Sequence, residues 1–207
     1  MPKSYSQQLS DAYAHLRKDK ALRPLLDAVG RVSIAPAPEP SPLHSLAQSI
    51  TNQQLNGKAA SAIFSRLLAM YSGCLDAERI SKTAEDELCS VGLSRAKAVA
   101  VKDLAEKAKA GIVPEWRTLR KMGDEEIIER LTQARGVGRW TVEMLLIFSL
   151  GRQDVWPVDD FAIKRAFGLY FGYAEPPKRT ELIAKAEGWR PWRSVVARCL
   201  WKYLDEG

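Results

Sequence analysis

The 207-residue chain is predicted to fold as an all-α protein. Apolar residues recur at helical spacing along most of the chain, whereas no segment shows the apolar and polar alternation of a strand and no tandem repeat is evident. Its 46% hydrophobic and 27% charged residues are typical of a soluble globular protein. The length is sufficient to bury a core, in one compact domain or in two small helical lobes.

The N-terminal part is predicted to contain a helical segment that ends near Gly30. Its apolar pattern consists of Leu16, Leu22, Leu25, Leu26 and Val29. Four alternating prolines follow, at positions 36, 38, 40 and 42. Because proline lacks an N–H and restricts φ, this stretch is predicted to be a linker or a tightly laid loop.

A series of amphipathic helices is predicted after this loop. Apolar faces with spacings of three and four residues lie within 43–50, 60–67, 98–108 and 127–131. Residues 140–150 are apolar nearly all round, which predicts a central helix buried on most sides. Another amphipathic helix over 163–170 follows Pro157, and a last helix is predicted to open near Pro191.

The charge and the cysteines narrow the class of protein. A net charge of +6 favours polyanionic partners, because clustered lysine and arginine release counterions from phosphates. Cys74, Cys89 and Cys199 are odd in number and widely spaced, which argues against a disulfide framework and a thiolate metal site. The polar N-terminus does not resemble a signal peptide, and the longest apolar run is too short for a bilayer. We therefore expect a soluble, intracellular protein.

A Gly-Val-Gly turn at Gly136, Val137 and Gly138 joins two of the predicted helices. Glycine permits the tight reversal and a close approach to another surface. The helix that begins near Arg139 presents unpaired N–H groups, which can hold a phosphate of a DNA backbone. Taken alone, the same turn also fits an ordinary connection between helices.

Two consecutive aspartates, Asp159 and Asp160, stand between Pro157 and the next predicted helix. One of them can cap that helix by accepting an N–H bond at its start. The other aspartate is then free to act elsewhere. Considered by itself, the pair is equally consistent with two residues that both serve the helix terminus.

Together, the hairpin and the aspartates resemble the helix-hairpin-helix-GPD superfamily of DNA glycosylases. The motifs that carry the resemblance read GVGRWT and WPVDDFAIK, and they are most similar to the alkylation-repair branch, DNA-3-methyladenine glycosylase II. The resemblance covers roughly residues 43–203. It implies a two-lobed helical bundle with an active-site cleft between the lobes, one lobe spanning about 43–130 and the other about 1–42 with 131–207.

The resemblance also implies a set of functional residues. Asp160 matches the catalytic carboxylate, and Asp159 would cap the helix. The base pocket would be lined by Trp140, Met144 and Trp201, although Trp201 equally fits a core aromatic residue. In the family, a wedge residue enters the duplex and fills the gap that the flipped nucleotide leaves. The loop that would carry this residue consists of Gln53, Gln54, Leu55 and Asn56. Other DNA contacts would come from the hairpin (Gly136, Val137, Gly138, Arg139 and Thr141) and from a second turn (Ser94, Arg95 and Lys97).

Gln53 and Gln54 are the stronger wedge candidates in the loop, which outside this family would be interpreted as a polar connection. The second turn, with Ser94, Arg95 and Lys97, is equally consistent with a solvated turn.

Two departures from the wider superfamily refine the expected reaction. Bifunctional relatives that resemble endonuclease III carry a nucleophilic lysine directly after Gly-x-Gly-Arg, where this chain has Trp140. A C-terminal cluster of four cysteines is also missing, which argues against an iron-sulfur cluster. No cofactor is expected to be required, although members of the superfamily hold a monovalent cation at main-chain carbonyls that correspond to Thr132, Ala134 and Val137.

The expected function is therefore hydrolytic excision of alkylated bases, of the 3-methyladenine or 7-methylguanine type, by a monomer acting on damaged duplex DNA. Met144 stands where a tyrosine can line the pocket, so the preferred lesion stays open. The alternatives are a noncatalytic DNA-binding module and a bifunctional glycosylase/AP lyase. The expected location is the bacterial cytoplasm, associated with the nucleoid, or the nucleus of a eukaryote.

Overall fold

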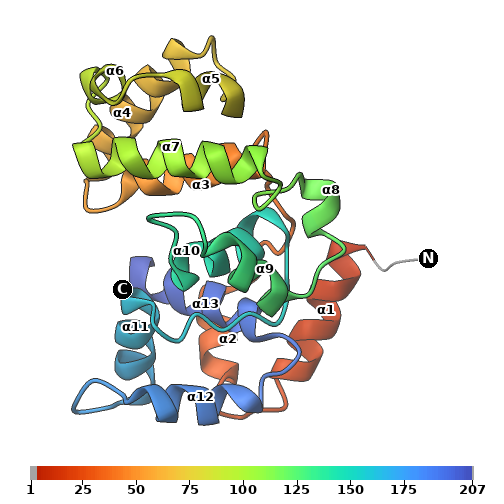
Figure 1. The fold of residues 1–207 in the computed structure, drawn as a ribbon. Coiled ribbons are helices and arrows are strands. Elements are labelled where there is room, and N and C mark those ends of the chain that lie inside the picture. Colours follow the sequence, from red (N-terminus) through yellow and green to blue (C-terminus); the bar gives the residue numbers. More distant parts are fainter. Residues whose placement is uncertain (1–3, 207) are drawn as a thin grey trace. The chain divides into compact units, whose positions relative to one another are not determined.

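A computed structural model describes residues 4–206, and within them every regular element is a helix (Figure 1). This confirms the predicted all-α class. The chain divides into two compact units, one formed by Met1–Ala37 with Leu146–Gly207 and the other by Pro38–Leu145. None of the helices in the described residues is long and apolar enough to cross a membrane.

Within residues 4–37 and 146–206, the first unit contains five α-helices: α1 (Tyr5–Leu16), α2 (Arg23–Val29), α11 (Phe161–Phe171), α12 (Arg179–Glu187) and α13 (Arg193–Glu206). Helix α13 packs against both α2 and α11. The N-terminal segment ends at Gly30 as predicted, where a φ of 63° favours glycine, but it is split into two helices by turns over 17–22. Helix α12 was not predicted, and α13 begins at Arg193 because residues 188–191 form turns.

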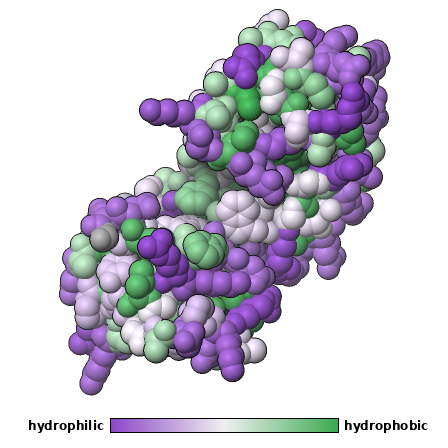
Figure 2. Space-filling model, turned by 90° about the vertical axis from the view of Figure 1, so that its left-hand side faces the viewer, coloured by the Kyte–Doolittle hydropathy of each residue, from purple (hydrophilic) through white to green (hydrophobic). Residues whose placement is uncertain are grey.

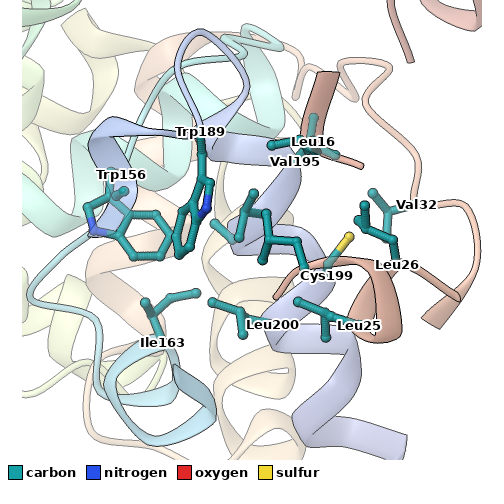
Figure 3. Packing of buried hydrophobic residues seen from close by; sticks show 14 of the residues in the cluster. Leu16, Leu25, Leu26, Val32, Trp156, Ile163, Trp189, Val195, Cys199 and Leu200 are labelled. Carbon is teal, nitrogen blue, oxygen red and sulfur yellow. The ribbon is translucent and has the colours of Figure 1, made fainter. Parts of the chain in front are cut away.

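The core of the first unit is largely aliphatic and includes the rings of Trp156 and Trp189 (Figure 3). The rings of Trp156 and Trp189 meet edge to face with centroids 5.3 Å apart, and Trp189 is almost fully buried. Its indole N–H still finds an acceptor, Asp19 Oδ2 at 3.0 Å. Ile163, at the start of α11, lies in the same cluster, which fixes the beginning of that helix against the core.

The second unit contains eight α-helices: α3 (Pro42–Asn52), α4 (Gly57–Met70), α5 (Ala77–Lys82), α6 (Glu85–Ser90), α7 (Arg95–Lys109), α8 (Trp116–Leu119), α9 (Asp124–Leu131) and α10 (Arg139–Met144). Helix α7 packs against α3, α5 and α6. The predicted apolar faces are buried at Leu46, Ile50 and Val101. Pro42 belongs to α3 rather than to the loop, because the first turn needs no N–H from it and Ser41 caps the helix.

The predicted central helix over 140–150 changes its geometry along its length. Helix α10 passes at Leu145 into a π-helical turn, η1 (Leu145–Ser149). Most side chains of this segment are buried, but Trp140 and Phe148 are 46% and 40% exposed.

The observed division of the chain differs from the expected lobes, since residues 131–145 group with 38–130. The cause is the packing of the hairpin turn. Gln53 Nε2 donates to the Gly136 carbonyl at 2.8 Å, and the Arg135 N–H donates to Asp103 Oδ2 at 2.7 Å. These bonds tie the turn to the C-terminal end of α3 and to α7.

Hydrophilic side chains cover much of the face seen in Figure 2, in both units, with hydrophobic residues exposed only in small groups. The chain has 31 lysine and arginine residues against 25 aspartate and glutamate residues, so cations predominate among its charged groups.

Truncation of Leu200, which is fully buried in the core of the first unit, tests the packing. Leu200→Ala is expected to lower the free energy of unfolding by about 2–5 kcal/mol, because it removes buried methyl groups and leaves a cavity. Leu169, on α11, is 59% exposed and provides the matched control. Leu169→Ala should change the free energy by no more than about 0.5 kcal/mol in the same urea titration.

Candidate functional site

The predicted hairpin lies between α9 and α10, in the second unit. Gly136 has a φ of 80°, and a Cβ added there would lie 3.2 Å from the Cβ of Ala100 on α7. Its conformation therefore favours glycine, and a larger residue would also press against Ala100. The Val137 N–H donates to the Ala134 carbonyl at 3.1 Å, which closes the turn, and Gly138 is the N-terminal cap residue of α10.

Arg139 holds the two helices of the hairpin together. Its guanidinium binds both carboxylate oxygens of Glu125, at 2.9 and 2.5 Å, and its Nε binds Glu143 Oε1 at 3.0 Å. Glu143 is only 4% exposed, so the arginine neutralises a buried carboxylate. The same arginine lowers the pKa of Glu125. Arg139, expected to contact DNA, thus has an internal role as well.

The predicted wedge loop connects α3 and α4. Gln54 has a φ of 57°, and Leu55 is 40% exposed although it is apolar. Asn56 caps α4 through its side-chain oxygen, which accepts the Ala59 N–H at 2.9 Å. The loop therefore presents Gln54 and Leu55 to its surroundings, while its two ends are held.

A pocket of about 450 Å³ lies within the second unit. Its lining is formed by Ser49, Asn52, Gln53, Gln54, Trp140, Thr141 and Met144. The structure thus brings together five of the predicted site residues, from the wedge loop and from the helix after the hairpin. Sequence reasoning missed Ser49 and Asn52. These two residues are three positions apart on α3, and Gln53 follows directly, so the three polar residues share one face of the helix. That polar face could have predicted them from the sequence.

Asp160 lies in the first unit, 7% exposed, at the beginning of α11. Its Oδ1 accepts the Ile163 N–H at 2.7 Å and the Trp201 Nε1–H at 3.1 Å. Asp160 is therefore the residue that caps the helix, and the prediction that Asp159 does so is wrong. The cap is the residue directly before the first turn, with extended backbone and an oxygen within reach of the third N–H.

Asp159 is exposed and pairs with two cations. Its carboxylate lies 3.4 Å from Lys164 Nζ and 3.4 Å from Arg179 Nε. Arg179 opens α12, the helix absent from the sequence prediction. Exposed pairs of this kind contribute little to stability.

Trp201, on α13, binds Asp160 and also contacts Phe148. The two ring centroids are 5.5 Å apart, and the guanidinium of Arg198 lies over the Phe148 ring at 4.5 Å. Arg198 also donates to the Ile147 carbonyl at 2.9 Å, and burial lowers its pKa. Phe148 and Arg198 were not predicted. Arg198 could have been found from the sequence, because it lies three residues before Trp201 and therefore on the same face of one helix.

The three residues predicted at the second turn all have partners in the protein. Ser94 caps α7, and Arg95 pairs with Glu85 and Asp86. Lys97 Nζ donates to the carbonyls of Thr51 and Gln53, at 2.8 and 2.7 Å. Lys97 thus contacts the end of α3, next to the wedge loop.

Side chains suited to a metal ion are not clustered in residues 4–206. No group of three or more histidine, cysteine, aspartate or glutamate residues is placed to hold a metal there. The cysteines are free, and burial raises the pKa of Cys199 to about 11. The carbonyls of Thr132, Ala134 and Val137 all lie in the hairpin turn.

Comparison with known proteins reveals one family. The model of the HhH-GPD superfamily base excision DNA repair protein matches residues 47–191. DNA-3-methyladenine glycosylase 1 of Schizosaccharomyces pombe is 36% identical over 163 residues, which are 78% of this chain and 72% of that protein.

Two solved structures are similar as well. The S. pombe 3-methyladenine DNA glycosylase in complex with abasic DNA has a TM-score of 0.81 and 34% identity, covering 93% of this chain and 95% of that one. A DNA-3-methyladenine glycosidase from Bacillus halodurans has a TM-score of 0.83 and 31% identity, covering 93% and 88%. These matches confirm the resemblance to the superfamily and to its alkylation-repair branch.

The two aspartates are distinguished by their effects on stability. Asp160→Ala removes a helix cap and leaves the Trp201 indole N–H without this acceptor, so it should cost about 2 kcal/mol of unfolding free energy. Asp159→Ala removes only exposed ion pairs and should change stability by less than about 0.5 kcal/mol. Equal effects in thermal unfolding would contradict the assignment of the cap to Asp160.

Proposed function

Because the chain belongs to the HhH-GPD superfamily of base excision DNA repair proteins, we propose that it is a monofunctional DNA glycosylase that flips alkylated bases out of duplex DNA and excises them by hydrolysis. The observation that carries the proposal is the carboxylate of Asp160, which is nearly buried and held by two donors at the position of the family motif.

DNA binding rests on the hairpin. The turn from Gly136 to Gly138 leads directly into the N-terminus of α10, whose cap residue Gly138 makes no side-chain hydrogen bond to the first turn. The first N–H groups of a helix have no acceptor within the helix and can bind a backbone phosphate. Contacts of this kind position a protein on DNA without reading its sequence. Such binding suits a repair enzyme, which must search for damage in any sequence context.

The pocket beside Trp140 supplies the recognition of the flipped base. Alkylation of a purine at N3 or N7 places positive charge on the base, and the face of an aromatic ring attracts a cation. Trp140 is partly exposed and lines the pocket, where Met144 adds an adaptable apolar surface. A base that stacks and pairs poorly is also easier to extrude, which adds selectivity.

Asp160 acts at the sugar. Cleavage of the glycosidic bond leaves positive charge on the ring carbon and oxygen, and a carboxylate stabilises that charge or activates the attacking water. The bonds from Ile163 and Trp201 hold the carboxyl group in one orientation, so little reorganisation is needed when the charge develops. Asp160 belongs to the first unit, whereas Trp140 belongs to the second.

Trp140 also bears on the type of reaction. An indole cannot attack the sugar as a lysine amine does in bifunctional enzymes, so the product is an intact abasic strand. This distinguishes simple hydrolysis from glycosylase/lyase chemistry.

A monovalent cation at the hairpin is part of the proposal. The main-chain carbonyls of Thr132, Ala134 and Val137 would hold this ion, because neutral oxygen ligands suit a hard cation rather than a transition metal. When bound, such an ion adds positive charge beside the phosphate-binding turn. The chain itself closes that turn through the bond between Val137 and Ala134.

The protein is proposed to work as a monomer on damaged duplex DNA, at the nucleoid of a bacterium or in the nucleus of a eukaryote. No other macromolecular partner is needed for the reaction as described.

Replacement of Asp160 by asparagine tests the chemistry. Asparagine also caps helices, so Asp160→Asn should fold normally and bind DNA while its release of methylated purines from methylated duplex DNA falls about 100-fold or more. The released bases are identified by mass spectrometry. If the wild-type protein binds DNA but releases no base, the chain is a binding module, and a covalent adduct trapped by borohydride would indicate a lyase.

Replacement of Trp140 tests the recognition of a charged base. A cation–π contact is worth roughly 0.5–2 kcal/mol, so Trp140→Leu should lower the rate of release of 7-methylguanine about 2- to 30-fold. Trp140→Phe keeps an aromatic face and should lose less. Equal losses in the two variants, measured under single-turnover conditions, would argue against a role for the ring.

A further inference from the structure

Lys97 makes an unusual contact at the C-terminal end of α3. Its ammonium donates to the main-chain carbonyls of Thr51 and Gln53, at 2.8 and 2.7 Å. The last carbonyls of a helix have no partner within the helix, and a cation is favoured at this end. Lys97 therefore fixes the backbone at the point where the wedge loop leaves α3.

Gln53 connects the same point to the hairpin. Its side-chain Nε2 donates to the carbonyl of Gly136 at 2.8 Å, while its own carbonyl accepts from Lys97. Gly136 tolerates no side chain without strain, so the acceptor is held firmly. One residue thus links the end of α3, α7 and the phosphate-binding turn.

The tip of the wedge loop, Gln54 and Leu55, lies between residues whose positions are held by hydrogen bonds. The Leu55 N–H donates to the Asn52 carbonyl at 3.2 Å, and Asn56 caps α4. Between them, Gln54 has a left-handed backbone, which is uncommon for a residue other than glycine and persists only where the surroundings impose it. The contacts of Lys97 and Gln53 lie directly before this residue, at the end of α3.

We propose that Lys97 and Gln53 are positioning residues, which couple the phosphate-binding hairpin to the wedge loop and hold Gln54 and Leu55 ready to fill the gap in the duplex. This inference rests on the proposed glycosylase function and assigns Lys97 a role other than a contact with DNA phosphates. Burial lowers the pKa of Lys97, as expected for an ammonium directed into the protein.

The main variant is Lys97→Met, which retains much of the aliphatic stem and removes the ammonium. Lys102→Met is the matched control. Lys102 lies on the same helix, and its Nζ donates to the Thr83 carbonyl at 2.6 Å, so the control removes an equal charge and a similar bond away from the loop. Gln53→Met provides a second test of the link, because it removes only the bond to Gly136.

The probe is a duplex with a tetrahydrofuran abasic site and 2-aminopurine on the opposite strand. Filling of the gap unstacks the 2-aminopurine and changes its fluorescence when wild-type protein saturates the DNA. We expect Lys97→Met and Gln53→Met to reduce this change at least about twofold, and Lys102→Met to match wild type. This readout requires no catalysis, so it is separate from the base-release test of the proposed function.

Excision provides the second readout. Displacement of the loop should slow base release from methylated duplex DNA about 10-fold or more in Lys97→Met, because small misplacements have large effects on rate. Lys97→Arg should restore little of the activity, since a planar guanidinium does not replace a compact ammonium between two carbonyls.

A phosphate contact predicts different results. In Lys97→Met, the slope of log binding constant against log salt concentration would then decrease by about one counterion. Lys97→Arg would restore both binding and excision. That pattern would overturn the inference, and so would a fluorescence change in Lys97→Met equal to that of the wild-type protein. Neither result would affect the proposed glycosylase function, which is tested separately by base release from the wild-type protein.

Discussion

The acceptance of two hydrogen bonds by one oxygen of Asp160 is the interaction on which the proposed chemistry depends. A nearly buried carboxylate is unfavourable unless donors compensate it. The donors come from different places, the first turn of α11 and the indole of Trp201 on α13. Ile163, which carries the first donor, and Leu200, which precedes Trp201, both lie in the buried core of the first unit (Figure 3). The stability of the first unit and the orientation of the carboxyl group therefore have a common origin.

The second unit is organised around the tight turn at Gly136. Its left-handed backbone and its close approach to Ala100 place a carbonyl where Gln53 reaches it. The same turn begins α10, which carries Trp140 and Met144 into the pocket beside the loop. The turn at Gly136 thus connects two parts of the candidate site, the pocket-lining helix α10 and the loop that follows α3. The internal pairing of Arg139 stiffens this arrangement by joining α9 to α10.

Several features were accessible from the sequence because they depend on local spacing. Helical periodicity predicted the faces of α3, α4, α7, α9 and α11, since the side chains that share a face recur every three or four residues. The Gly-Val-Gly turn and the aspartate pair, each contiguous in the chain, indicated the family before any contact was known. Helix α12 and the short helices α5, α6 and α8 were not predicted, because their apolar patterns are too short to be distinguished from loops.

Other features were decided only by tertiary structure. Which aspartate caps α11 depends on where the helix begins, and that is set by the burial of Ile163 rather than by residue type, since both residues are aspartate. The membership of the hairpin in the second unit depends on contacts with α3 and α7. Lys97 and the Thr51 carbonyl are 46 residues apart, and Trp201 and Asp160 are 41. By itself, the sequence determined the fold class, the family motifs and the candidate site residues. Packing decided which partners each of these residues binds, because those partners are distant in the chain.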